Sequence, residues 1–189
     1  MPPLHGVPDR LRAWWARTQP SALDRETNRS GRINVFTRVK RLLRPQDRIL
    51  DLGCGPGILA RECGRRDIVG VDMSPVMAEA ARQWMDEVVP GNIFEHYPLE
   101  AVDTVVVCNV LEPYPAEIRR TLLGHIAEFL SPGGRVLVVI AMPAGFGSVG
   151  ECGLDLLFPS PNLGGMRGEL TPGDVEDDLA LVGFDLGST

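Results

Sequence analysis

The sequence predicts an α/β fold of the Rossmann-like, doubly wound type, in which a mainly parallel sheet lies between two layers of helices. Short β-branched runs alternate with segments of helical periodicity, and no internal repeat interrupts the alternation. The inner runs are apolar on both faces, as buried parallel strands are. With 189 residues, 44% of them hydrophobic and 23% charged, the chain has the size and composition of one globular domain.

Two helices open the expected order of elements. Residues 9–18 have amphipathic spacing and include Trp14 and Trp15, and residues 30–44 repeat apolar side chains at helical intervals. The second helix ends where Arg44 precedes a proline.

Strands and helices then alternate through the rest of the chain. We expect strands at residues 48–53, 67–72, 92–96, 101–110 and 135–141, joined by helices at residues 57–64, 74–88 and 115–130. A helix at residues 171–181 and the start of one more strand at residues 183–186 follow.

Three regions differ in composition and divide the chain. We interpret residues 1–44 as a helical cap and residues 45–189 as the Rossmann-like domain. Within that domain, residues 142–170 are rich in glycine and proline and lack periodicity, which indicates a long loop or lid. The cap and the lid are expected to cover a substrate pocket together.

The C-terminal region shortens the expected sheet. Only one strand start follows the last helix, so the outer edge of the fifth strand lacks a covering strand. Because an open edge favours pairing with another chain, we expect either a truncated chain or a protomer whose edge is covered by a second copy or a partner chain.

Composition excludes several classes of protein. The four cysteines have no paired short spacing, which indicates reduced thiols and neither a zinc site nor a disulfide framework. No apolar run is long enough to span a bilayer, and the N-terminus lacks the apolar stretch of a secretion signal. We therefore expect a cytoplasmic protein with no membrane contact and no metal.

Charge is unevenly distributed along the chain. Residues 1–48 carry 11 Lys and Arg against 4 Asp and Glu, a net charge of +7, and the remainder carries 8 against 21, a net charge of −13. A basic arm can favour an anionic substrate or nucleic acid, but it is more often the solvated face of a helix. Nucleic acid is therefore not the expected partner.

A glycine-rich turn follows the first predicted strand. Glycines at positions 53, 55 and 57 allow the backbone to turn sharply and to approach a ligand closely. The turn lies at the carboxyl end of a strand, where open α/β sheets bind their ligands. Its G-x-G-x-G spacing differs from the G-x-G-x-x-G of dinucleotide-binding proteins.

Two carboxylates accompany this turn. Asp72 ends the second predicted strand, where a carboxylate can accept hydrogen bonds from both hydroxyls of a ribose. Asp51 precedes the glycines and can orient the amides of the turn or meet a cationic ligand. Acidic residues around the turn favour a cation over a pyrophosphate.

Four segments follow one another along the chain, namely DLGCGPG, VGVDMSP, CNVLE and SPGGRVLVV. Taken in order, they resemble the motif series of class I methyltransferases that depend on S-adenosylmethionine (SAM). The resemblance is closest to the small-molecule enzymes related to ubiquinone and menaquinone biosynthesis, and it covers residues 47–141.

The resemblance implies SAM as cofactor and S-adenosylhomocysteine (SAH) as product, and it also implies roles for the residues of the glycine turn. Gly53, Cys54, Gly55 and Gly57 would line the methionine end of SAM, with Asp51 supporting them.

The same resemblance extends to the ends of the other strands. Asp72 would hold the ribose, and Met73 would pack on the adenine. Asn92, followed by Ile93, takes the position that meets the adenine amino group, where the family often has aspartate. Asn109 would face the methionine moiety through its backbone.

No catalytic residue follows from the sequence. Methyl transfer needs a general base only where the acceptor atom is protonated. Glu112 and Tyr114 lie near the expected site, with His96 and His125 as further candidates, but each side chain fits a structural role better.

Three functions compete at this point. The first is methyl transfer to oxygen or carbon of a small molecule. The second is methylation of RNA or protein, supported only by the basic N-terminal arm, and the third is a non-catalytic or accessory member of the fold. An NAD oxidoreductase is disfavoured because the glycine spacing is wrong.

Overall fold

The computed structural model describes residues 35–94, 100–140 and 170–186. In this part of the chain, five parallel strands form one sheet in the order β3-β2-β1-β4-β5, which confirms the predicted parallel, doubly wound architecture. The strands are β1 (Ile49–Leu52), β2 (Val69–Asp72), β3 (Glu87–Pro90), β4 (Val102–Cys108) and β5 (Leu130–Val139).

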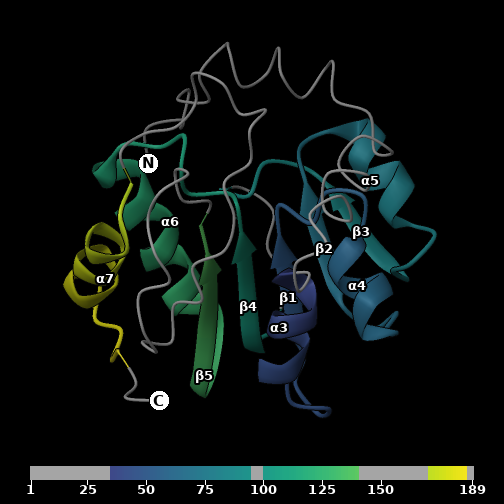
Figure 1. Cartoon of the computed structure of the whole chain (residues 1–189), viewed down its shortest axis with the longest axis horizontal. Helices are drawn as coiled ribbons and strands as arrows, with labels where there is room; N and C mark the ends of the chain where they lie inside the picture. The colour runs from purple at the N-terminus through teal and green to yellow at the C-terminus, as the bar shows by residue number, and fades with distance from the viewer. Residues whose placement is uncertain (1–34, 95–99, 141–169, 187–189) are drawn as a thin grey trace.

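Helices cover both faces of the sheet. Figure 1 shows α5 beside β3 at one edge, and α6 and α7 beside β5 at the other. The five described helices are α3 (Val35–Leu42), α4 (Ile58–Cys63), α5 (Pro75–Ala81), α6 (Ala116–Phe129) and α7 (Pro172–Leu181). None of the helices in the described ranges has the length and apolar character needed to cross a membrane.

Two hydrophobic clusters fill the layers on either side of the sheet. On one face, side chains of α3, α4 and α5 pack against strand residues such as Ile49 and Val106. On the other face, side chains of α6 and α7 pack against residues such as Leu52 and Val107. Neighbouring strand residues thus point to opposite clusters, which explains why the inner strands are apolar on both faces.

The third strand lies earlier in the chain than predicted. The expected helix to residue 88 ends at Ala81, and the strand expected at residues 92–96 is instead β3, which pairs with β2. Val88 and Val89 share the apolar spacing of the preceding helix, but β-branched side chains favour a strand and β3 completes the edge beside β2. Residues 92–94 of the predicted strand form an irregular connection and a turn, and residues 95–99 lie outside the described ranges.

Two further boundaries differ from the prediction. Strand β5 begins at Leu130, where the pairing with β4 is irregular before Arg135 resumes the register opposite Thr104. The segment 131–134, expected to end the helix before the strand, is therefore a bulge within β5. Residues 183–186 form a turn and coil, so the strand start predicted there is wrong.

Several predicted features lie outside the described residues, namely the helix at residues 9–18 with Trp14 and Trp15 and all but the last residue of the lid at 142–170. Of the predicted cap, the described part is α3, whose Val35 and Val39 pack in the core with α4. Strand β5 lies at the edge of the described sheet. That another chain covers this edge stays a prediction.

A polar network around the buried Asp47 connects the turn before β1 with the neighbouring strands β4 and β5. Asp47 is 4% exposed, and its Oδ2 accepts hydrogen bonds from Thr104 Oγ1 at 2.7 Å and from Arg135 Nη2 at 3.0 Å. Burial opposes ionisation of Asp47, but the hydrogen bonds from Thr104 and Arg135 outweigh it and hold the pKa of this carboxyl below its usual value. The network therefore ties β4 and β5 to the turn that precedes β1.

We expect Asp47→Asn to lower the free energy of unfolding by about 2–4 kcal/mol, because it leaves the buried Thr104 hydroxyl and the partly buried Arg135 guanidinium without a charged acceptor. Asp86→Asn is the matched control, since Asp86 pairs with Arg66 at 2.7 Å while its side chain is 67% exposed, and it should cost less than about 1 kcal/mol. Urea denaturation at pH 7 measures both. Equal losses in the two variants would contradict the structural role of Asp47.

Candidate functional site

The turn after β1 is built from three glycines in left-handed backbone conformations. Gly53, Gly55 and Gly57 have φ values of 76°, 53° and 78°. The amides of Gly53 and Cys54 both donate to the carbonyl oxygen of Val71, at 2.8 and 3.1 Å. The turn is therefore held against the end of β2, and α4 begins directly after it.

The three glycines are needed for different reasons. A Cβ on Gly53 would lie 2.5 Å from a side-chain carbon of Val110, and one on Gly57 would lie 3.1 Å from the backbone of Ala81. At Gly55 a Cβ would meet no atom within 4 Å. The outer two glycines thus serve packing, whereas Gly55 borders open space in which a ligand can approach the backbone.

Asp72 fastens the glycine turn to the start of α5. Its Oδ2 accepts a hydrogen bond from the amide of Gly55 at 2.8 Å, and its Oδ1 accepts one from the amide of Ser74 at 2.8 Å. Burial raises the pKa of this carboxyl, although the two amides oppose the shift. Each oxygen keeps a second lone pair, so the carboxylate can still accept hydrogen bonds from a ligand.

Asp51 is the second buried carboxyl of the site. It is 2% exposed, and within the described residues no hydrogen-bond donor reaches its carboxylate. Burial, together with the nearby negative charge of Asp72, raises the pKa of Asp51 to about 7. A cationic ligand beside Asp51 would oppose this shift.

The end of β3 adds a polar side chain to the same edge. Asn92 lies two residues after the strand, and the amide of the intervening Gly91 donates to the carbonyl of Asp72 at 2.9 Å. The side-chain Oδ1 of Asn92 accepts from the amide of Phe94 at 3.1 Å, which closes a tight turn. The earlier position of β3 thus places the turn that contains Asn92 beside the end of β2.

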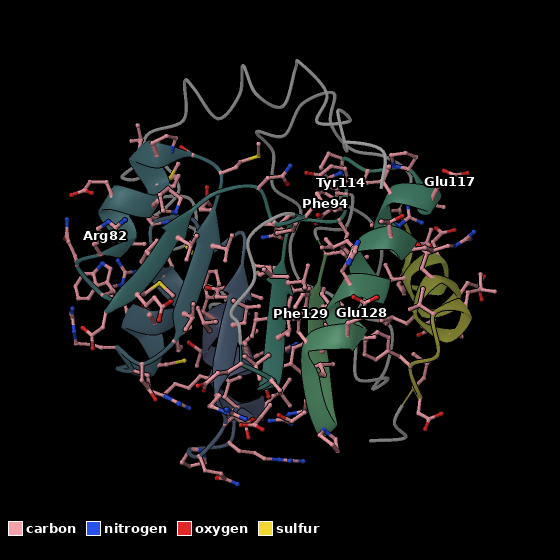
Figure 2. All side chains as sticks on the ribbon, turned by 180° about the vertical axis from the view of Figure 1, so that it is seen from behind. Arg82, Phe94, Tyr114, Glu117, Glu128 and Phe129 are labelled. Atoms are coloured by element: carbon pink, nitrogen blue, oxygen red, sulfur yellow. The ribbon has the colours of Figure 1, made fainter. Side chains whose placement is uncertain are left out.

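Apolar side chains flank Asn92 and Asp72. Ile93 is buried and Met73 is partly buried, and both belong to the cluster on the α6 and α7 face. Phe94, which the sequence did not single out, packs edge-on against Tyr114 with ring centroids 5.6 Å apart. Figure 2 shows these two rings beside each other near the start of α6. The sequence carries no local signal for this contact, because Phe94 and Tyr114 are distant along the chain.

The end of β4 contributes a residue in an unusual backbone conformation. Asn109 has a φ of 56° and is the non-glycine residue with positive φ in the described ranges. Its amide donates to the carbonyl of Val139 at 2.8 Å, which continues the ladder into β5. Asparagine tolerates this conformation better than most side chains, and such residues are common at functional sites.

The cysteines near the site are not suited to nucleophilic catalysis. Cys54 and Cys108 are buried, and burial together with the neighbouring Asp51 raises the pKa of both thiols. Cys63 is partly buried, and mainly burial raises its pKa to about 11. Thiols that remain protonated act as small apolar side chains.

The candidate bases lie in contrasting surroundings. Tyr114 is buried in the core, and burial raises its pKa to about 12, which makes it a poor base. His125 lies in α6 toward the end remote from the site, with Nδ1 3.7 Å from Glu128 Oε2. Glu112 follows β4 with Oε2 buried. His96 lies outside the described residues.

The arrangement suits a ligand that is both cationic and hydroxylated. Nine of the ten predicted cofactor residues lie in or directly after β1, β2 and β4, or in the turn after β3, and the tenth, Gly57, caps α4. These are the carboxyl ends of parallel strands, which meet at one edge of the sheet. In the ranges that the structure describes, no group of three His, Cys, Asp or Glu side chains could hold a metal ion.

A family comparison agrees with this geometry. A model described as "Methyltransferase domain" matches residues 49–134, which run from the first residue of β1 into β5. The matched region contains each of the ten predicted cofactor residues.

Curated relatives match only locally. The ribosomal protein L11 methyltransferase of Burkholderia ambifaria is 48% identical over 44 residues, 22% of this chain and 15% of the relative. That of Burkholderia vietnamiensis is 42% identical over 48 residues, 24% of this chain and 16% of the relative. The chain thus spans about one sixth of the length of the curated relatives it matches.

Solved structures share the fold over most of the chain. Magnesium protoporphyrin IX methyltransferase from Synechocystis PCC 6803, solved with bound SAM, has a TM-score of 0.66 and 18% identity, over 96% of this chain and 88% of that one. Human N-acetylserotonin methyltransferase in complex with SAM has a TM-score of 0.63 and 24% identity, over 95% and 55%. A TehB-like SAM-dependent methyltransferase from Corynebacterium glutamicum has a TM-score of 0.56 and 20% identity, over 93% and 79%.

The raised pKa of Asp51 predicts that the stability of the ligand-free protein depends on pH. Because this pKa is raised in the folded state, the contribution of Asp51 to stability is favourable below about pH 4 and is lost as pH rises toward 7. At pH 8 we expect Asp51→Asn to raise the free energy of unfolding above that of the wild type by on the order of 2–4 kcal/mol. The difference should vanish near pH 4. Urea titrations across this range measure it.

Asp177→Asn supplies the control, because Asp177 is an exposed carboxylate on α7. It should show no comparable trend between pH 4 and pH 8. A stability gain from Asp51→Asn that does not depend on pH would contradict the raised pKa assigned to Asp51.

Proposed function

We propose that this chain is a class I SAM-dependent methyltransferase and that it transfers the methyl group of SAM to an oxygen or carbon atom of a small molecule. One observation carries the assignment of the site: two buried carboxylates lie beside a glycine turn that is open at Gly55. A cationic nucleoside fits this combination better than a pyrophosphate, which both carboxylates would repel.

The glycine turn and Asp51 are proposed to hold the methionine end of SAM. Gly55 leaves room where any side chain would project into the ligand. Asp51 carries negative charge without a donor among the described residues, so the ammonium and sulfonium groups of the ligand supply the missing compensation. Binding of such a cation favours the ionised form of Asp51 and therefore strengthens as pH rises toward 7.

Asp72 and the turn after β3 are proposed to hold the nucleoside. The free lone pairs of the Asp72 carboxylate accept hydrogen bonds from the ribose hydroxyls, while the amides of Gly55 and Ser74 keep it in place. Asn92 Oδ1 accepts from Phe94 and has a second lone pair for the adenine amino group. Met73 and Ile93 supply apolar surface for the adenine ring.

The main contribution of the protein to the reaction is to position the acceptor relative to the methyl group. Bound SAM supplies a methyl group that is already activated by the sulfonium. The chain therefore has to hold the acceptor in line behind that methyl group and to exclude water. Cys54 and Cys108 remain protonated and do not compete as nucleophiles. We assign no general base.

The names of two structurally similar proteins support a small-molecule acceptor. Two of the similar structures are named for small-molecule acceptors, a porphyrin and N-acetylserotonin. A protein acceptor is the second candidate, favoured by the local match to ribosomal protein L11 methyltransferases. Incubation with labelled SAM and separate pools of metabolites, ribosomal proteins and RNA distinguishes them, because label in the protein pool alone would overturn the small-molecule proposal.

Gly55→Ala tests the site with a matched control. Gly64 also has a left-handed conformation, with φ of 66°, and a Cβ there also meets open space, but it caps the far end of α4. Both substitutions should cost a similar amount of stability, about 1 kcal/mol, through backbone strain. We expect only Gly55→Ala to weaken SAM and SAH binding, by more than about tenfold, because its methyl group occupies the ligand space.

Isothermal titration calorimetry with SAM, SAH and NAD measures these affinities. The wild type should bind SAM and SAH but not NAD. Wild-type affinity in the Gly55 variant, or equal losses in the Gly55 and Gly64 variants, would contradict the proposed location of the site.

A further inference from the structure

A buried arginine connects the last helix to the loop that follows β4. Arg119 is 9% exposed, and its Nε donates to Asp178 Oδ2 on α7 at 2.6 Å. Through Nη1 the same guanidinium donates to the carbonyl oxygen of Tyr114 at 3.0 Å. The planar fork of an arginine can hold two such acceptors at once, which a lysine cannot do with the same geometry.

Tyr114 connects Arg119 with the turn after β3. Its ring meets Phe94 edge-on, at an interplanar angle of 84°, so the loop after β4 contacts the turn after β3 (Figure 2). The backbone amide of Phe94 in turn donates to Asn92 Oδ1. A continuous series of contacts therefore runs from Asp178 through Arg119, Tyr114 and Phe94 to Asn92.

We propose that Arg119 is a positioning residue that sets the orientation of Asn92 toward the adenine of the cofactor, acting through Tyr114 and Phe94. The inference rests on the proposed function, because it takes Asn92 as the residue that meets the adenine. Asp178 anchors the series, since its carboxylate is 1% exposed and fixes the Arg119 guanidinium from α7.

A purely structural role is the competing explanation, and the chain offers a control for it. Arg120 also donates to Asp178, through Nε to Oδ1 at 2.7 Å, and its side chain is 42% exposed. Among the described residues its partner is Asp178, so it shares the ion pair without holding Tyr114. Substitution of either arginine therefore weakens the ion pair with Asp178. Substitution of Arg119 alone also removes the hydrogen bond to Tyr114 and so breaks the series of contacts to Asn92.

The test compares Arg119→Lys with Arg120→Lys in the full chain, by calorimetric titration of SAH and of S-inosylhomocysteine, which lacks the adenine amino group. We expect Arg119→Lys to weaken SAH binding about fivefold, as loss of a positioning hydrogen bond would, and to bring the two affinities closer together. Arg120→Lys should change neither affinity by more than about twofold. Circular dichroism confirms that both variants are folded.

A second measurement follows the path of the effect. In a Phe94→Leu background, Arg119→Lys should weaken SAH binding by no more than about twofold further, because residues in one series of contacts act non-additively. Independent, multiplicative losses would overturn the series from Arg119 to Asn92.

Each remaining outcome has a distinct meaning. Equal losses for Arg119→Lys and Arg120→Lys, or equal losses for SAH and its inosine analogue, would assign Arg119 a structural role only and overturn the proposal. A wild type that binds neither compound would instead overturn the proposed function, and this inference with it.

Discussion

Two like charges at adjacent strand ends are the constraint on which the site depends. Asp51 in β1 and Asp72 at the end of β2 are both buried, and the negative charge of Asp72 disfavours ionisation of Asp51. Backbone amides stabilise Asp72 from both sides, but no described donor does so for Asp51. The fold therefore leaves one negative charge to be compensated from outside, and a cationic ligand does so where a phosphate would not.

At the amino ends of the strands, another buried carboxylate is stabilised by groups of the protein itself. Asp47 is as deeply buried as Asp51, yet Thr104 and Arg135 reach its carboxylate and lower its pKa. This contrast separates a carboxylate whose hydrogen bonds are completed within the fold from the one that we propose to meet a ligand. Where the fold completes the hydrogen bonds itself, the acid holds strands together, and where it does not, the acid is available to a ligand.

Local patterns predicted most of the fold and the residues that the candidate site brings together. The glycine turn, the acids at positions 51 and 72 and the strands that precede them could be read from the chain, because apolar runs and turn residues act over a few neighbours. The third strand was misplaced because Val88 continues the helical spacing of Trp84, and only pairing with β2 reveals it as a strand. The bulge at residues 131–134 and the coil at residues 183–186 likewise depend on packing and not on local signals.

The sequence alone determined the parallel architecture, the order of the motifs and the identity of the residues that follow the first two strands, because these depend on local periodicity and backbone conformation. The tertiary structure decided which of those residues meet and how strongly they interact. Asp72 reaches Gly55 across 17 residues, and Arg119 reaches Asp178 across 59. Charge, burial and hydrogen bonding between such distant positions arise only when the chain is folded, since they depend on distances in space and not along the chain.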